Sequence, residues 1–334
     1  MEQKIEIGKD LSICKILNGM WQVSGSHGYI DPKKAIEEML AYHSLGFTTW
    51  DLADIYGPAE VFVGKFRKAL EKAKGKESLK NSQALTKFVP NTGPMTKNIV
   101  EYYVDKSLEK MNTDCLDLIQ FHWWDYHNSS YIDALVHLSN IRDKGKIKHI
   151  GLTNFDTERL EIIKDQGLKI ISNQVQYSIL DQRPEKLMVP FCKQNGIYLF
   201  SYGTLLGGFL SEKYLDSPEP LKGSLDTASL RKYYNMIIRW GGWDLFQELL
   251  QKLFEISKKH DCSIANVATS FILEKPAVAG VIIGARLGIS EHRHDNLRVF
   301  DFHLDGEDKS MINSVTEKSN NLFEIIGDCG DEYR

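Results

Sequence analysis

The segment from Gly46 to Glu60, GFTTWDLADIYGPAE, carries the features on which the fold depends. It contains a short run, residues 47–51, that is rich in threonine and aromatic side chains and is therefore typical of a buried β-strand. The run stops at Asp51, and Tyr56 follows five residues later. Because chemistry gathers where parallel strands end in barrel enzymes, this strand end is a candidate functional position.

Similar apolar runs recur along the 334 residues of the chain. Eight strands are expected, at residues 16–18, 47–51, 83–87, 116–122, 149–153, 170–175, 198–202 and 281–284. Before the first of them, KIEIGKDLSICKI has two short runs around Gly8-Lys9-Asp10, which predicts a β-hairpin. Helical patterns lie between the strands, at residues 32–44, 98–111, 131–142, 157–165, 185–194, 245–260 and 290–299.

The alternation of strands and helices predicts an α/β fold with a parallel sheet. Eight such units favour closure into a single (β/α)8 barrel, a TIM barrel, that spans residues 1–334. An open doubly wound sheet is the alternative, but no GxGxxG turn follows the first strand. The hairpin occupies residues 1–15, and residues 205–243 form a long stretch without a strand pattern after strand 7, expected to cover the barrel mouth. The tail, residues 317–334, either folds over this mouth or lies elsewhere.

Composition argues against several function classes. The net charge is −4 and charges of both signs are interspersed, which argues against nucleic-acid and membrane-surface partners. The five cysteines are widely spaced and form no CxxC or Cys/His pattern, which favours a reducing compartment and no metal site. Of these thiols, Cys329 is expected to be the most exposed. The chain begins without an apolar signal core, and no apolar run approaches the ~18 residues of a membrane span, so a cytoplasmic location is expected.

Charged side chains stand where successive strands stop. Asp51 ends the second expected strand, Lys87 the third and His122 the fourth. Because the carboxyl ends of barrel strands meet at one rim, these three side chains are expected to converge with Tyr56. Taken singly, each has a structural explanation, as a helix cap, a surface lysine or a buried histidine. Their occurrence together at successive strand ends favours a proton-transfer site.

The four side chains suit the protonation of a carbonyl group. A phenol is a weak acid at neutral pH, because its pKa is near ~10. An ammonium group such as Lys87 close to the phenol is expected to lower that pKa, and Asp51 would hold the ammonium in place. An imidazole can donate a hydrogen bond to the developing alkoxide. Peptide hydrolysis fits poorly because no Ser or Cys nucleophile is paired with a base, and metal chemistry fits poorly because His122 has no second histidine at ligand spacing.

With these residues in place, the sequence resembles the aldo-keto reductases from Gly19-Met20-Trp21 to Asp295-Asn296, almost the whole chain. GFTTWDLADIYGPAE is similar to the family's Asp/Tyr signature, LTK at 85–87 carries its lysine, and DLIQFHWW at 117–124 carries its histidine. The resemblance implies an NAD(P)H-dependent oxidoreductase acting on CH–OH and C=O groups. It further implies a catalytic tetrad of Asp51, Tyr56, Lys87 and His122, with Tyr56 as general acid.

The resemblance also implies where a nicotinamide dinucleotide binds. Thr153, Asn154 and Gln174 are similar to the group that holds the nicotinamide carboxamide, and Tyr202 takes the place of the aromatic residue that stacks on the ring. Ser is more frequent than Thr at position 153, and either hydroxyl can form the hydrogen bond. The other implied cofactor contacts are Gly19, Met20, Leu205, Gly207, Gly284, Ala285, Arg286, His292, Asp295 and Asn296.

The end of the eighth strand departs from the family pattern. GARLGISEHRHDN, residues 284–296, is longer than the common version and lacks the Lys-Ser pair of many NADPH-preferring members. His292 stands where Arg or Gln is frequent. Arg286 can still pair with a 2′-phosphate and Arg293 can assist, so NADPH is expected rather than NADH. The alternative is that both arginines are merely exposed charges.

Tryptophans crowd the expected mouth. Trp21 follows the first strand, Trp123 and Trp124 follow the fourth, and Trp240 and Trp243 lie in the long stretch. Trp21 and Trp123 directly follow strand ends and are the expected substrate contacts, whereas Trp240 and Trp243 suit packing and pocket equally. An aromatic-walled pocket fits an apolar or aromatic aldehyde or ketone.

Reduction of such a carbonyl to an alcohol with NADPH is therefore the leading hypothesis. A second hypothesis is a cofactor-binding regulatory subunit with little turnover, like the potassium-channel β subunits of the resembled family. A third is an NAD(P)-dependent dehydrogenase that oxidises a sugar or an alcohol. The expected partner is a small-molecule carbonyl substrate, with the oligomeric state left open.

Overall fold

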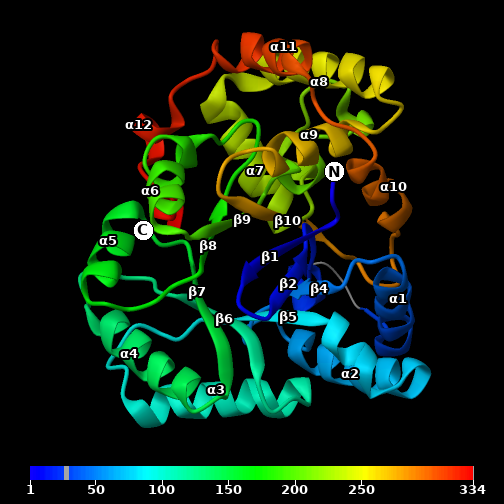
Figure 1. Ribbon diagram of the computed structural model, residues 1–334. Coiled ribbons are helices and arrows are strands. Elements are labelled where there is room, and N and C mark those ends of the chain that lie inside the picture. Colours follow the sequence, from blue (N-terminus) through cyan, green and yellow to red (C-terminus); the bar gives the residue numbers. More distant parts are fainter. Residues whose placement is uncertain (26–29, 334) are drawn as a thin grey trace.

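A closed barrel of parallel strands forms the centre of the computed structural model, which describes residues 1–25 and 30–333. The strands follow one another around the barrel in chain order, and the last pairs with the first, so that Ile16 stands opposite Val281. Helices form a layer around it (Figure 1). The predicted (β/α)8 barrel is confirmed, and the alternative of an open sheet is wrong.

The eight barrel strands lie close to their predicted ranges. They are β3 (Ile16–Gly19), β4 (Thr49–Asp51), β5 (Gln83–Phe88), β6 (Leu116–His122), β7 (Ile147–Thr153), β8 (Ser172–Gln176), β9 (Tyr198–Tyr202) and β10 (Val278–Gly284). The ends of β4, β6, β7, β9 and β10 coincide with the predicted ends. The candidate site residues were chosen because they stand at strand ends. Since most of these ends lie where the sequence predicted, the site residues lie at the carboxyl rim of the barrel.

Helix α1 (Pro32–Ser44) shows why some helices were predictable to the residue. Asp31 precedes it in an extended conformation and accepts a hydrogen bond from the Lys34 amide, and proline occupies its first turn. The other helices are α2 (Ala59–Lys74), α3 (Lys97–Met111), α4 (Ser130–Asp143), α5 (Thr157–Asp165), α6 (Met188–Asn195), α7 (Ala228–Trp240), α8 (Gly242–Lys259), α9 (Ile264–Leu273), α10 (Arg293–Leu297), α11 (Gly306–Thr316) and α12 (Leu322–Ile326). No helix of the described residues is long and apolar enough to cross a membrane.

The predicted hairpin is present and closes one end of the barrel. Strands β1 (Lys4–Gly8) and β2 (Leu11–Cys14) pair antiparallel, and the hairpin lies across the barrel in Figure 1. Its buried side chains Ile7, Leu11 and Ile13 join a separate apolar cluster with Leu17, Leu85, Leu118 and Phe200 from inside the barrel. Burial of these side chains stabilises the fold and leaves the opposite, carboxyl end for chemistry.

The long stretch after β9 is only partly a loop, because it contains α7 and three short 3-10 turns, η4 (Leu206–Gly208), η5 (Glu212–Tyr214) and η6 (Lys222–Ser224). Trp240 and Trp243, at the junction of α7 and α8, are buried. The Trp243 indole donates to the Ser217 carbonyl over 3.0 Å and packs on Phe246. Both tryptophans therefore serve packing in this structure.

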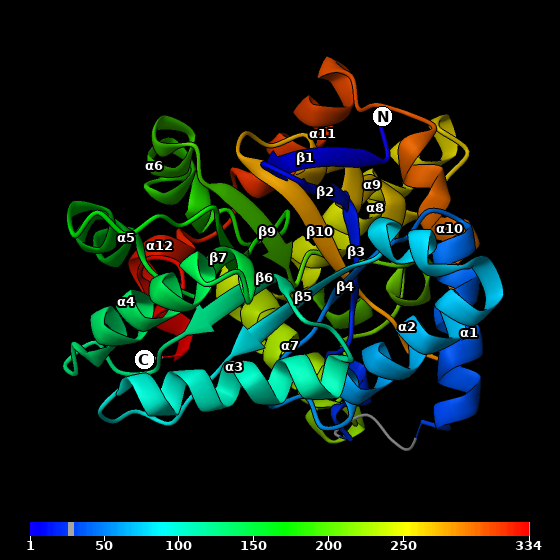
Figure 2. The same cartoon turned by 60° about the horizontal axis from the view of Figure 1, so that its bottom comes forward.

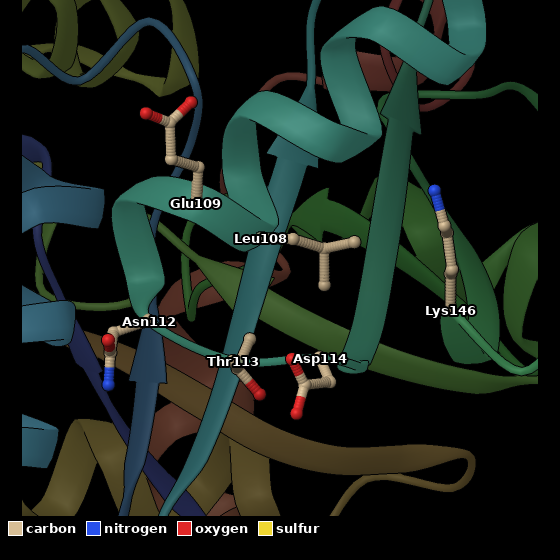
Figure 3. A pocket seen from close by; sticks show the side chains of 6 residues that line it. All are labelled: Leu108, Glu109, Asn112, Thr113, Asp114 and Lys146. Atoms are coloured by element: carbon tan, nitrogen blue, oxygen red, sulfur yellow. The ribbon is translucent and has the colours of Figure 1, made fainter.

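A hollow of about 650 Å³ lies at the amino end of the barrel wall (Figure 3). It is formed where α3 ends and the chain turns into β6. Its lining consists of Leu108, Glu109, Asn112, Thr113, Asp114 and Lys146. Barrel enzymes carry out chemistry at the other end, so this hollow is separate from the site described next.

Candidate active site at the carboxyl rim of the barrel

Asp51 and Lys87 form a buried ion pair at the ends of the neighbouring strands β4 and β5. The Lys87 Nζ lies 2.8 Å from Oδ1 and 2.7 Å from Oδ2 of Asp51, and it also donates to the Leu52 carbonyl over 3.2 Å. Both side chains are nearly inaccessible to water. Burial lowers the pKa of Lys87, while the Asp51 charge acts in the opposite direction and supports the ammonium form.

Two amide side chains complete the surroundings of Asp51. The Gln120 Nε2 donates to Asp51 Oδ1 over 3.0 Å, and the Gln174 Nε2 donates to the same oxygen over 2.7 Å. The Gln174 Nε2 also donates to the side-chain oxygen Oε1 of Gln120 over 2.9 Å. Gln174, expected to face a carboxamide, therefore belongs here to the buried network. Gln120 was missed, although it lies two residues before His122 on β6 and so faces the same side of the strand.

Tyr56 stands in the loop after β4, with the Lys87 Nζ 5.1 Å from the centre of its ring. Burial raises the pKa of Tyr56 well above its ordinary value, and the charges of Asp51, Tyr333 and Asp54 act in the same direction. The expectation that Lys87 lowers this pKa is therefore wrong for this structure. The physical reason is that the Asp51 carboxylate balances the lysine charge, which leaves removal from water as the dominant effect.

His122 ends β6 and is buried, with its ring centre 4.2 Å from that of Trp124. Trp124 is 41% exposed, whereas its neighbour Trp123 is fully buried. The Trp123 indole donates to the carbonyls of Asp125 and Asn128, and Trp123 therefore offers no surface to a substrate here. Trp124, which the sequence placed at the mouth but not among the expected substrate contacts, is the exposed residue beside His122. Trp21 is 36% exposed, so its ring is accessible to a substrate, as the prediction of a substrate contact requires.

The residues expected to hold a nicotinamide ring lie together on the next strand ends. Thr153 ends β7 and is buried, and its Oγ1 has no hydrogen-bond partner within the described part of the chain. Asn154 has a left-handed backbone with φ of 58°, which is uncommon outside glycine but tolerated by asparagine. The Tyr202 hydroxyl at the end of β9 donates to the Asn154 Oδ1 over 2.8 Å. A buried hydroxyl beside an amide and an aromatic ring fits a nicotinamide carboxamide.

The first and last barrel strands bring further predicted contacts together. Gly19 and Gly284 are register partners at the ends of β3 and β10, and the Ala285 amide donates to the Gly19 carbonyl over 2.9 Å. Met20 is buried beside them, and its amide donates to the Asp51 carbonyl. These positions therefore lie on the same rim as the ion pair.

After β9, Leu205 precedes the short turn η4, in which Gly207 has a φ of 67°. A side chain at Gly207 would approach Ser229 and Tyr233 to about 3.1 Å, so the turn requires glycine. The compact turn is compatible with close approach of a ligand phosphate to backbone amides.

The residues expected at the adenosine end of the cofactor differ in exposure and in whether they already have a partner. Arg286 is exposed, whereas the Arg293 guanidinium is 2.5 Å from the Glu38 carboxylate on α1. Asp295 accepts hydrogen bonds from Ser263 and Asn266. His292 is exposed, and Asn296 is buried on α10. Arg286 is consequently the cation available to a 2′-phosphate, while Arg293 is already engaged.

The C-terminal tail reaches the same rim, which sequence reasoning left open. The Tyr202 hydroxyl is 3.1 Å from the Glu332 carboxylate and 3.2 Å from the Tyr333 hydroxyl. The tail offers no strand or helix periodicity that would have placed it there. Cys329 within it is buried, so the expectation of an exposed thiol is wrong; Cys115 and Cys262 are the partly exposed thiols.

Comparison with known proteins agrees with this geometry. Residues 15–317 match the sequence profile of the Aldo/keto reductase family. Among curated relatives, the NADH-specific methylglyoxal reductase of Escherichia coli is 24% identical, with 94% of this chain and 98% of the relative covered.

Solved structures share the fold. The glycerol dehydrogenase AKR11B4 from Gluconobacter oxydans superposes with a TM-score of 0.78 at 20% identity, covering 98% of this chain and 97% of that one. An aldo/keto reductase from Klebsiella pneumoniae, in complex with NADP and acetate, gives 0.71 at 19% identity, covering 95% and 96%.

Proposed function

The chain belongs to the aldo/keto reductase family of NAD(P)H-dependent oxidoreductases acting on carbonyl groups, and from this premise we propose that it reduces an aldehyde or ketone to an alcohol with Tyr56 as proton donor. The observation that carries the proposal is the buried Asp51–Lys87 pair with the Tyr56 ring 5.1 Å from the ammonium. Three groups that can hold or orient a proton meet at one strand rim, as a carbonyl reductase requires.

Tyr56 is suited to the reductive direction. Its raised pKa keeps the phenol protonated at neutral pH, so Tyr56 already carries the proton to be transferred when a substrate binds. The alkoxide that forms from a carbonyl is a much stronger base than a phenolate, so proton transfer from Tyr56 remains favourable. In the opposite direction the phenol would first have to lose its proton, which burial disfavours.

The other members of the tetrad act on Tyr56 and on the carbonyl oxygen. Asp51 holds Lys87 in position, and Gln120 and Gln174 hold Asp51 through its Oδ1. His122 lies at the adjacent strand end, where an imidazole N–H can donate a hydrogen bond to the substrate oxygen. A fixed donor stabilises the developing negative charge without having to reorganise.

Bound at this rim, a nicotinamide dinucleotide supplies the hydride that adds to the carbonyl carbon. Thr153 and Asn154 would hold its carboxamide and Tyr202 would lie against its ring, as the buried Thr153 hydroxyl without a partner among the described residues supports. The turn with Gly207 and the adjoining Gly19 and Gly284 would line its phosphates.

NADPH is the cofactor we propose, on the evidence of Arg286. Its side chain is exposed, and guanidinium groups bind phosphate strongly. The Klebsiella structure holds NADP, while the Escherichia coli relative is named as NADH-specific, so relatives support both choices. Arg286 is the feature of this chain that favours the phosphorylated form.

The proposed substrate is a small apolar or aromatic carbonyl compound. Trp21 and Trp124 are large, partly exposed aromatic side chains that follow the ends of β3 and β6. Such rings bind apolar surface well and leave few hydrogen bonds to satisfy. The free state of all five cysteines is compatible with a cytoplasmic enzyme, which we propose as its setting, with residues 1–334 as one domain.

The direct test is a turnover assay with NADPH and NADH against a panel of aldehydes and ketones. Reduction of apolar aldehydes with NADPH is the expected result. Tight cofactor binding with negligible turnover would instead favour a regulatory subunit. Turnover of alcohols or sugars alone at neutral pH would favour a dehydrogenase.

A further inference from the structure

Tyr126 lies in the loop between β6 and α4, one of two neighbouring loops at the carboxyl rim. Strands β6 and β7 pair in the barrel, and α4 and α5 lie outside them (Figures 1 and 2). The fully buried Trp123 fixes the shape of this loop, because its indole donates to the carbonyls of Asp125 and Asn128 over 2.7 and 2.9 Å. The position of Tyr126 is therefore set by a buried side chain of the same loop.

The Tyr126 hydroxyl bridges two backbone groups of the neighbouring loop, which follows β7. It donates to the Asn154 carbonyl over 3.2 Å and accepts from the Asp156 amide over 3.2 Å. On one side of this bridge, the Asn154 amide donates to the Gln174 carbonyl over 2.8 Å. On the other side, the Asp156 carboxylate caps α5 by accepting from the Arg159 amide over 2.8 Å. A side chain of one loop thus closes the next loop at a residue expected to face nicotinamide.

The backbone of Asn154 needs support of this kind. Its φ of 58° lies in the left-handed region, which residues with a side chain adopt uncommonly. Such a conformation persists where the surrounding contacts hold it. Tyr126 bonds the backbone of Asn154, and the Tyr202 hydroxyl donates to its side-chain Oδ1 over 2.8 Å. The backbone and the side chain of Asn154 are therefore each held by a tyrosine hydroxyl.

The ring of Tyr126 is aligned by its packing. The central carbon of the Arg159 guanidinium lies 4.6 Å from the ring centre. The rings of Phe155 and Tyr131 lie 5.8 and 6.1 Å from it, centre to centre, and Phe155 is fully buried. These contacts hold the ring in place, so its hydroxyl stays directed at the loop after β7.

We propose that Tyr126 is a positioning residue for cofactor binding, which holds Asn154 in the conformation that presents its side-chain amide to the nicotinamide carboxamide. The inference rests on the proposed function, because it takes Asn154 as a ligand of the carboxamide. Tyr126 acts through Asn154 and does not itself contact the cofactor. Its hydroxyl should consequently affect the nicotinamide half of the dinucleotide and leave the adenosine half unaffected.

The test uses two phenylalanine variants and two ligands. Tyr126→Phe keeps the ring and its packing and removes the hydroxyl. Tyr131→Phe is the matched control, because Tyr131 packs on the same Phe155 ring at 5.9 Å, while its hydroxyl bonds to neither Asn154 nor Asp156. The ligands are NADPH and adenosine 2′,5′-bisphosphate, which carries the adenosine and the 2′-phosphate but no nicotinamide. Dissociation constants are measured by isothermal titration calorimetry.

Tyr126→Phe should raise the dissociation constant of NADPH about three- to tenfold, as expected for the loss of one or two hydrogen bonds. The dissociation constant of adenosine 2′,5′-bisphosphate should not change, which also shows that the variant is folded. Tyr131→Phe should bind both ligands as the wild-type chain does. Unchanged NADPH binding in Tyr126→Phe, or an equal loss for both ligands, would overturn the inference.

A double-variant cycle tests whether Tyr126 acts through Asn154. Asn154→Ala removes the side-chain amide and should weaken NADPH binding by itself. Adding Tyr126→Phe to Asn154→Ala should then change the dissociation constant by less than about twofold, because the contact that Tyr126 positions is already gone. Losses that multiply in the double variant would show that Tyr126 acts elsewhere, which overturns the inference.

The inference and the proposed function fail in different ways, because these measurements need no turnover. If wild-type protein binds NADPH but reduces no carbonyl compound, the proposed reaction fails, while the dissociation constants still decide the role of Tyr126. If wild-type protein reduces carbonyl compounds and Tyr126→Phe binds NADPH normally, only the inference fails. If wild-type protein binds NADH instead, the pair NADH and ADP takes the place of the two ligands.

Discussion

The Nζ of Lys87 lies 2.8 and 2.7 Å from the two carboxylate oxygens of Asp51, and both side chains are buried. The ammonium charge is thus balanced by a carboxylate at closer range than the Tyr56 ring, whose centre is 5.1 Å away. This explains why burial dominates the pKa of Tyr56 and raises it. The Asp51–Lys87 pair therefore holds the site residues in position and does not lower the pKa of Tyr56.

Removing both members of this pair should cost less free energy of unfolding than the two single removals added together. Lys87→Met leaves the Asp51 charge buried without its partner and should lower the free energy of unfolding by about 3–5 kcal/mol. The double variant Lys87→Met, Asp51→Leu should lose less than the sum of the two single changes. Urea unfolding of the four proteins measures this, and simple additivity would contradict the assigned pairing.

Tyr56→Phe should lower kcat for carbonyl reduction by about 10²–10⁴-fold, because phenylalanine has no hydroxyl proton to transfer to the substrate oxygen. Cofactor affinity, measured by fluorescence titration, should remain nearly unchanged. Tyr102→Phe is the matched control, since Tyr102 is exposed on α3. Near-normal turnover in Tyr56→Phe would show that another group supplies the proton.

The two reaction directions should respond differently to pH. Because burial raises the pKa of Tyr56 above 10, the acid needed for reduction stays protonated from about pH 6 to about pH 9. Alcohol oxidation needs the phenolate, so its kcat/KM should rise about tenfold for each pH unit in that range. The check is kcat/KM in both directions as a function of pH. An oxidation rate that stays flat across this range would argue against Tyr56 as the titrating group.

Arg286→Ala should weaken NADPH binding about tenfold or more and leave NADH binding nearly unchanged, because only NADPH carries the 2′-phosphate. Arg293→Ala is the matched control, since the Arg293 guanidinium is held by Glu38. Dissociation constants of both cofactors for both variants provide the measurement. Equal losses for NADPH and NADH in Arg286→Ala would remove this residue from phosphate recognition.

Asp54→Asn should stabilise the protein at neutral pH but not in acid. Burial raises the pKa of Asp54 from 3.8 to about 6, although its carboxylate accepts from the Val89 amide. The folded state therefore holds this proton more tightly than the unfolded state, so stability falls as pH rises toward about 6 and stays reduced above it. An asparagine oxygen can still accept from Val89 without a charge to bury.

The difference in Tm between Asp54→Asn and wild type should accordingly be larger at about pH 8 than at about pH 4. Asp143→Asn, at an exposed position on α4, serves as control. A difference in Tm that is equal at both pH values, or larger in acid, would show that Asp54 is not the source.

The fold was predictable where local signals were strong. α1 and α5 begin at capping residues, Asp31 and Asp156, whose side chains accept from the backbone, and their ranges were predicted to the residue. α9 was missed because almost all of its side chains are buried, which removes the amphipathic periodicity that identifies surface helices. α7 was missed because it lies in a stretch rich in Gly, Ser, Trp and Tyr.

The site was predictable to the extent that strand ends determine it. Asp51 and His122 end strands that the sequence located correctly, and Lys87 lies one residue before the end of β5. Trp123 and Trp124 both follow the end of β6, so only the folded chain shows that Trp123 is buried and that Trp124 is 41% exposed. The approach of Tyr333 to Tyr202 joins positions 131 residues apart without any repeating pattern, so only tertiary structure reveals it.

The pairing of Ile16 with Val281 has a consequence for biosynthesis. While the chain emerges from the ribosome, β3 keeps one unpaired edge until β10 has been made, which is nearly the end of translation. An exposed strand edge can pair with other chains, so this interval is the vulnerable period for the nascent protein. Slow elongation or truncation before residue 278 should therefore favour aggregation, even when the other seven barrel strands have already been synthesised.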